Sequence, residues 1–153
     1  MDKSLGYRVL NLAVNPFTDA HASYFHHSIG GYHGAKLRRY QEFVDSVMNI
    51  DLNYFYSNIN NIQNEIDQAN LLASLKSLNM LNTKYIIYNY QAAPLVNNQR
   101  YGSAWFVDNI QFVPNANQEI IALRKSNPLQ TAVVNEEFKD KLNGFTPSHN
   151  PNS

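Results

Sequence analysis

A leucine-rich segment that runs almost directly into a strand-like segment constrains the fold of this chain most strongly. Residues 68–81 carry apolar side chains at helical spacing, which predicts an amphipathic helix with one apolar stripe: Leu71, Leu72, Leu75, Leu78 and Leu81. Asn82 and Thr83 then lead into the apolar run 84–89, which is suited to a central strand. Because a helix followed so closely by a strand is half of an α/β unit, this junction favours an α/β fold.

The other periodic segments fit the same class. Strand-like patterns occupy residues 7–14, 104–108, 110–114 and 131–134, and a bulge at Asp108 and Asn109 can interrupt the middle pair. Helical patterns occupy residues 20–29, 35–48 and 136–142, with one more helix that begins at Asn115 or Asn117. We predict a layered domain with helices packed on a small mixed β-sheet, and α+β is the alternative.

Two polar stretches separate these elements. Residues 51–64 mix aromatic side chains with asparagine, which prefers caps and turns, so short helical turns or an irregular loop are expected there. Residues 90–103 contain proline, glycine and several amides, and predict a loop. Residues 1–145 are expected to form a single domain, and residues 146–153 a linker-like tail.

The composition excludes several classes of function. Twelve basic and twelve acidic residues give a formal net charge of +0, which argues against a general nucleic-acid binder. The chain has no cysteine, which removes disulfides, thiolate nucleophiles and cysteine-ligated zinc. No apolar run approaches the roughly 18 residues that cross a bilayer, so the chain as given is expected to be soluble. Its abrupt start and its tail suggest a piece of a larger protein.

The main candidate surface is residues 23–41, which we call the elbow. It holds three of the five histidines, and its glycines Gly30, Gly31 and Gly34 interrupt two helical patterns. Glycine at such a break allows a positive φ or a close approach of backbones, and loops of this kind often carry function. We therefore expect a tight, polar, aromatic-rich turn here, and Gly31→Val should disturb it more than His149→Ala disturbs the tail.

Three kinds of chemistry were weighed for the elbow. Adjacent His26 and His27 point about 100° apart on a helix, and with His33 they find a third ligand only in Asp19, so a metal is not expected. Serine hydrolysis is not expected either, because no Gly-x-Ser-x-Gly motif is present. The cations that begin helix 35–48 are disfavoured by the helix dipole, so either an anionic ligand or nearby carboxylates such as Glu42 would compensate them.

A saccharide site would combine aromatic faces with amides and hydroxyls. The elbow tyrosines Tyr24, Tyr32 and Tyr40, together with Trp105, are candidates for this role, although burial in the core is the alternative for each. Polar residues of the first strand would supply the amides, unless they face solvent or bond loop backbone. The candidate ligand-binding residues are Arg8, Asn11, Asn15, Tyr24, His26, His27, Tyr32, His33, Lys36 and Arg39. No catalytic residue, metal or cofactor is predicted.

The amino-acid sequences of four segments resemble those of a known protein family. YRVLNL at residues 7–12, SYFHHSIGGYHGAKLRRYQ at 23–41, LNMLNTKYII at 78–87 and AWFV at 104–107 resemble the soluble part of the YfhO family of bacterial membrane proteins. The likeness is to versions from the Bacteroidetes group and spans about residues 7–138. These multi-pass proteins look related to lipid-dependent glycosyltransferases of the GT-C type, whose acidic catalytic residue lies in a loop between membrane helices. This chain has the family's wording without those helices, so no catalytic residue is carried over.

The resemblance implies a noncatalytic domain on the extracytoplasmic side of the bacterial cell membrane. Its partners would be the transmembrane part and remaining soluble part of the same parent chain, with a saccharide or polyprenyl-phosphate sugar as ligand and no nucleic acid. The alternative is a freestanding small hydrolase or metal-binding enzyme that uses His26, His27 or His33. Apolar spans on either side in the gene would favour the first hypothesis, and tight stoichiometric zinc binding the second.

Overall fold

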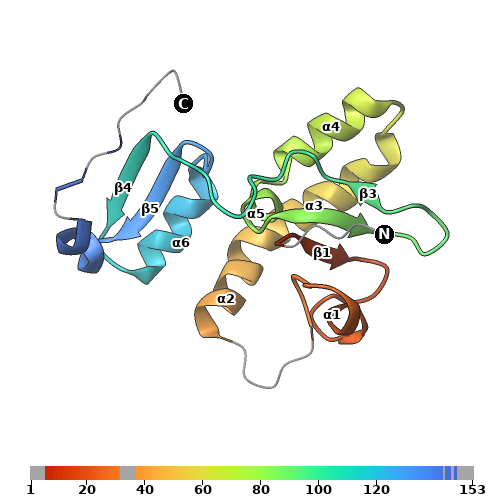
Figure 1. The fold of residues 1–153 in the computed structure, drawn as a ribbon, viewed down its shortest axis with the longest axis horizontal. Helices are drawn as coiled ribbons and strands as arrows, with labels where there is room; N and C mark the ends of the chain where they lie inside the picture. The colour runs from red at the N-terminus through yellow and green to blue at the C-terminus, as the bar shows by residue number, and fades with distance from the viewer. Residues whose placement is uncertain (1–5, 32–36, 143, 146, 148–153) are drawn as a thin grey trace.

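Two small sheets organise the chain (Figure 1). The computed structural model describes residues 6–31, 37–142, 144, 145 and 147. One sheet has the order β1-β2-β3, in which β2 lies centrally, parallel to β1 and antiparallel to β3. The other sheet is the parallel pair β4-β5. The strands are β1 (Arg8–Asn11), β2 (Thr83–Ile87), β3 (Leu95–Val96), β4 (Asn109–Val113) and β5 (Thr131–Asn135).

Helices alternate with these strands and confirm the predicted class of helices packed with a small mixed sheet. They are α1 (His21–Phe25), α2 (Arg38–Phe43), α3 (Asn49–Asn58), α4 (Glu65–Ser74), α5 (Lys76–Met80) and α6 (Ala116–Lys125). A π-helical turn, Val44–Met48, joins α2 to α3, and 3-10 turns follow at Ile59–Asn61 and Glu136–Leu142. None of the helices in the described residues has the length and apolar character needed to cross a membrane.

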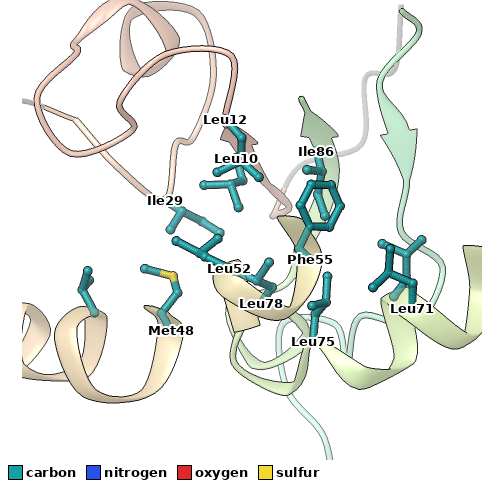
Figure 2. Packing of buried hydrophobic residues seen from close by; sticks show 12 residues of the cluster. Leu10, Leu12, Ile29, Met48, Leu52, Phe55, Leu71, Leu75, Leu78 and Ile86 are labelled. Carbon is teal, nitrogen blue, oxygen red and sulfur yellow. The ribbon is translucent and has the colours of Figure 1, made fainter. Parts of the chain in front are cut away.

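The main core lies between the mixed sheet and helices α3, α4 and α5. Figure 2 shows side chains from β1 and β2 directed toward those of the helices below them. Four of the five leucines in the predicted stripe are buried, and Leu81 is half-buried. The largest fully buried side chain is Phe55, whose edge also meets the ring of Tyr88 at a centroid distance of 6.3 Å. Together these side chains form one apolar cluster: Leu10, Leu12, Ile29, Val44, Met48, Leu52, Phe55, Leu71, Leu72, Leu75, Leu78 and Ile86.

Three helical predictions need correction. Helix α1 ends at Phe25 and does not continue to Ile29, because residues 27–29 form backbone hydrogen bonds with Val9 of β1. Residues 49–58 form the regular helix α3 rather than short helical turns or an irregular loop, because burial of Leu52 and Phe55 outweighs the weak helix propensity of the asparagines. The predicted helix 68–81 is divided into α4 and α5 at Leu75, whose backbone leaves the helical region at φ −83° and ψ 66°. That break places the Leu75 side chain fully in the core.

The segment before β4 also differs from the prediction. Residues 104–108 lie outside the strands, and β4 begins at Asn109. Trp105 is half-buried, and its indole Nε1 donates a hydrogen bond to the carbonyl of Pro128 at 2.8 Å. The indole therefore anchors this connecting segment to the loop before β5.

The parallel pair forms a second unit with α6. Asn115, one of the two predicted caps, accepts a hydrogen bond from the Gln118 N–H at 3.0 Å and so begins α6. The helix connects β4 to β5, as parallel strands require, and it packs against β5 and the π-helical turn. Figure 1 shows this unit beside the mixed sheet, with the connecting segment passing α5.

The chain after α1 returns to the outer edge of β1. Val9 donates to the carbonyl of His27 at 2.9 Å and accepts from the N–H of Ile29 at 3.1 Å, which forms a parallel bridge beside the first strand. Gly30 follows directly, and a Cβ atom there would lie 1.7 Å from the carbonyl oxygen of Pro16. This glycine is required for the close approach of two backbones.

Candidate functional site

The polar residues of the first strand and its turn serve the fold. Asn11 is buried, donates to the hydroxyl of Tyr90 at 3.2 Å and accepts from the N–H of Ala13 at 3.0 Å. Asn15 accepts from the N–H of Phe17 at 3.0 Å and stabilises the turn after the strand. Both amides thus bond loop backbone, which was the alternative to ligand binding.

Arg8 and Tyr40 lie close together and join β1 to the helices. The Arg8 guanidinium donates to the carbonyl of Leu81 at 3.3 Å, and the Tyr40 hydroxyl donates to the carbonyl of Ile29 at 2.7 Å. Burial raises the pKa of Tyr40, and the positive charge of Arg8 partly opposes that rise. The phenol therefore stays protonated at neutral pH and acts as a hydrogen-bond donor.

The aromatic and histidine candidates on α1 and directly after it face solvent. Tyr24 is 84% exposed and packs edge-on against Phe25, while His26 and His27 are exposed and contribute backbone groups to the helix end and the bridge. Among the described residues, no group of three histidine, aspartate or glutamate side chains is arranged to hold a metal ion. The remaining candidates Tyr32, His33 and Lys36 lie outside the described residues.

Arg39 forms ion pairs with the second unit. Its guanidinium lies 3.6 Å from a carboxylate oxygen of Glu119 on α6 and 3.9 Å from one of Glu137. Arg38 instead pairs with Glu42 on its own helix at 2.8 Å, as the sequence suggested. Carboxylates therefore compensate both of these cations at the start of α2, and Arg39 helps join the two units.

The described candidates thus do not converge on one site, and a cavity lies elsewhere in the described residues. A cavity of about 510 Å³ lies between the α4–α5 region, the segment after β3 and the loop before β5. We call it the amide cavity. Lys76, Asn98 and Gln99 line it and are exposed, whereas Arg100 and Tyr101 line it and are half-buried.

A buried pair of amides holds one wall of the amide cavity in shape. Asn97 is fully buried, and its Nδ2 donates to Asn79 Oδ1 at 2.7 Å and to the carbonyl of Thr83 at 2.9 Å. Asn79 in turn donates to the carbonyl of Leu72 at 2.9 Å, and its own carbonyl accepts from the N–H of Tyr101 at 3.1 Å. Buried amides satisfied in this way specify one conformation, so this segment is preorganised.

The same network positions the charged and aromatic groups of the wall. The Asn97 carbonyl accepts a hydrogen bond from Arg100 Nη1 at 3.1 Å, which uses one of the five guanidinium donors. The ring of Tyr101 meets the edge of Trp105 at a centroid distance of 5.2 Å. Burial raises the pKa of Tyr101 and the charge of Asp51 raises it further, so the hydroxyl remains a donor at neutral pH.

Asp51 supports the cavity from α3. Its carboxylate accepts from the N–H of Ser77 at 2.7 Å and from the hydroxyl at 2.6 Å, which satisfies a donor at the start of α5. Burial raises the pKa of this carboxyl, while the Ser77 hydrogen bonds and the charge of Lys76 oppose the rise. Lys76 and Asp51 therefore attract each other near the cavity rim.

These groups suit recognition of a polar molecule. The walls offer amides and a phenol, which can both donate to and accept from hydroxyl-rich ligands, and two cations, which can donate to them. The sequence does not predict this site, because its walls come from residues far apart in the chain and the pattern of residues 90–103 indicates only a loop. The run of amides before Arg100 was the available signal.

Comparisons with known proteins add no relative. No protein-family model, curated protein or solved structure matches this chain significantly.

Proposed function

We propose that this chain is a noncatalytic extracytoplasmic domain of a YfhO-like bacterial membrane protein, and that it recognises a glycan or glycan acceptor for that protein. The amide cavity is the observation that carries the proposal. Its volume of about 510 Å³ lies within the range of small-molecule sites. Its amides, phenol and preorganised wall are the groups that a saccharide's hydroxyls require.

The family context of the proposal comes from the resemblance of the four sequence segments. In that context the transmembrane part of the parent chain would carry any glycosyl transfer, from a polyprenyl-phosphate sugar, and this domain would help to hold the acceptor or product. The gene should therefore encode apolar spans of about 20 residues flanking this region. A gene without such spans would contradict the family assignment.

The recognition role can be tested with the chain's single tryptophan. Because Trp105 packs against Tyr101, its fluorescence should change when a ligand enters the amide cavity. We expect oligosaccharides of bacterial surface glycans to change this emission in a saturable way, with no turnover of the sugar. Asn98→Ala should weaken binding about threefold, the scale of one lost neutral hydrogen bond.

A matched amide elsewhere provides the control. Asn53 is exposed on α3 and does not line the cavity, so Asn53→Ala should leave binding unchanged. Equal loss in both variants, or an absence of binding by calorimetry for every saccharide tried, would contradict the recognition role.

A further inference from the structure

The charge of the amide cavity narrows the ligand class further. Two cations, Lys76 and Arg100, line the cavity, and its lining contains no carboxylate. The ion pairs found among the described residues are Arg38–Glu42, Arg39–Glu119 and Arg39–Glu137, and none includes either cation. Arg100 therefore has no carboxylate partner among the described residues, whereas Lys76 interacts electrostatically with Asp51 without forming a close ion pair.

Of the two cations, Arg100 is more preorganised to bind an anion. It is half-buried, and its hydrogen bond to the carbonyl of Asn97 fixes one edge of the guanidinium on a fully buried residue. The remaining donors keep the planar arrangement that matches carboxylate and phosphate oxygens. Little conformational entropy would be lost when such a group binds.

Lys76 is less available to bind an anion than Arg100. It is exposed, and it interacts electrostatically with Asp51, which lies behind the cavity and is engaged by Ser77. This carboxylate offsets part of the positive charge at that side of the cavity. Arg100 should therefore contribute more than Lys76 to the recognition of an anion.

Resting on the recognition role proposed above, we propose that the amide cavity binds a saccharide carrying an anionic group, a carboxylate or a phosphate, that contacts Arg100 and Lys76. The amides of Asn98 and Gln99 face the same cavity and supply contacts for the neutral hydroxyls. A charged hydrogen bond is roughly twice as strong as a neutral one, so the anionic group should dominate discrimination between ligands.

Calorimetry together with Trp105 fluorescence tests this inference on the full chain. The probes are glucose, glucuronate, glucose 1-phosphate and inorganic phosphate. We expect at least one of the two charged sugars to bind about tenfold more tightly than glucose, and which of them binds more tightly identifies the anion. Inorganic phosphate should bind more weakly than the charged sugars, because it makes no hydroxyl contacts.

Variants assign the effect to the cavity. Arg100→Gln should weaken binding of the charged sugar about tenfold and Lys76→Gln about threefold, and each should weaken binding of glucose less than binding of the charged sugar. The control is Arg124→Gln, an exposed cation of α6 outside the cavity lining, which should change nothing. If Arg100→Gln fails to fold, the salt dependence of wild-type binding decides: affinity for the charged sugar should fall between 0.05 and about 0.5 M salt while that for glucose stays constant.

The outcomes separate the two proposals. Equal affinity for glucose and the charged sugars, with no effect of Arg100→Gln or of salt, overturns the anionic ligand and leaves glycan recognition standing. Binding of inorganic phosphate as tight as that of sugar phosphate shows an anion site without sugar recognition and overturns both. The absence of binding for all four probes also overturns both.

Discussion

At the scale of single residues, a few positions determine how closely two segments of backbone approach each other. Gly30 lies where the chain passes Pro16, and the next N–H, that of Gly31, donates to the Pro16 carbonyl at 2.7 Å. Asn97 and Asn79 play the corresponding role at the amide cavity, where their side chains hold a loop against a helix. In both places one small or polar residue fixes a tertiary contact.

Gly30→Ala should destabilise the fold strongly. The added Cβ would overlap the Pro16 carbonyl oxygen, so the backbone must move and the Gly31 hydrogen bond is lost. We expect a loss of roughly 2–3 kcal/mol in the free energy of unfolding, measured by urea denaturation.

Gly31→Ala is the matched control for that experiment. Gly31 has a φ of +136°, which strains any other residue, but among the described residues its Cβ would meet the side chain of Ser23 alone, at about the ordinary contact distance of 3.5 Å. A loss of about 1 kcal/mol is expected from backbone strain alone. If both variants lose the same stability, the close approach to Pro16 is not the reason for glycine at position 30.

At the scale of elements, the start of α5 depends on a carboxylate supplied by another helix. Asp51 on α3 accepts both hydrogen bonds of Ser77, although partial burial of the carboxyl disfavours its charged form. The helix thus begins without a cap from its own sequence, since Leu75 provides no side-chain acceptor. The ordinary capping rule is satisfied through tertiary structure.

Asp51 should make stability depend on pH in a defined direction. Because the folded state raises the pKa of this carboxyl, the folded chain holds the proton more tightly than the unfolded chain. The resulting stabilisation is complete below the ordinary value of 3.8 and is lost as pH rises through the raised pKa. Relative to Asp51→Asn, which does not titrate, the wild type should therefore gain stability on acidification from pH 7 toward pH 3.5.

Urea unfolding of both proteins across this pH range measures the difference. Asp51→Ala separates charge from hydrogen bonding, because it removes the acceptor as well and should be about 1–2 kcal/mol less stable than Asp51→Asn at any pH. A wild type that loses stability relative to Asp51→Asn on acidification would mean that the folded state favours the carboxylate.

At the scale of the whole molecule, the two units meet through few polar contacts. Arg39 reaches Glu119 and Glu137, Trp105 donates to Pro128, and α6 packs against the π-helical turn. A smaller cavity of about 140 Å³ lies between α2 and α6, lined by Arg39 and Glu119 among others. Charged and apolar side chains therefore both contribute to the junction between the units.

Arg39→Ala should weaken this junction measurably. A buried carboxylate oxygen of Glu119 forms no hydrogen bond among the described residues and lies 3.6 Å from the Arg39 guanidinium, so the variant removes the ion pair of this oxygen. We expect a loss of roughly 1 kcal/mol, and the double-mutant cycle with Glu119→Ala should give a coupling energy of about 0.5 kcal/mol that decreases at high salt.

The exposed pair on α2 is the control for the same measurement. Arg38 is 92% exposed and pairs with Glu42 within its own helix, so Arg38→Ala should cost only about 0.3–0.5 kcal/mol. Equal effects for Arg38→Ala and Arg39→Ala would show that the ion pair between the units adds nothing beyond a surface pair.

The sequence predicted what depends on local pattern. The leucine stripe, the central strand after Asn82 and the cap at Asn115 follow from periodicity and turn chemistry, and each lies where expected. Asn82 itself adopts the left-handed conformation at φ +54°, as asparagine readily does at a helix end.

Features that depend on tertiary contacts escaped prediction. Burial of Phe55 stabilises the helical conformation of α3. The separate sheet β4-β5 depends on which strands pair, and periodicity does not encode strand pairing. The amide cavity brings Lys76 together with Arg100 and Asn127, which no local pattern relates. The cluster of histidines in residues 23–41 indicated a candidate site, yet His26 and His27 face solvent.

The walls of the amide cavity have one more consequence. Lys76 and Asn79 belong to the first unit, whereas Asn127 and Leu129 precede β5 in the second. A molecule bound there would contact both units and stabilise their association. Amide hydrogens of β4 and β5 should therefore exchange more slowly as the occupancy of the cavity rises. Binding in the amide cavity would then reduce local opening of β4 and β5, although neither strand lines the cavity.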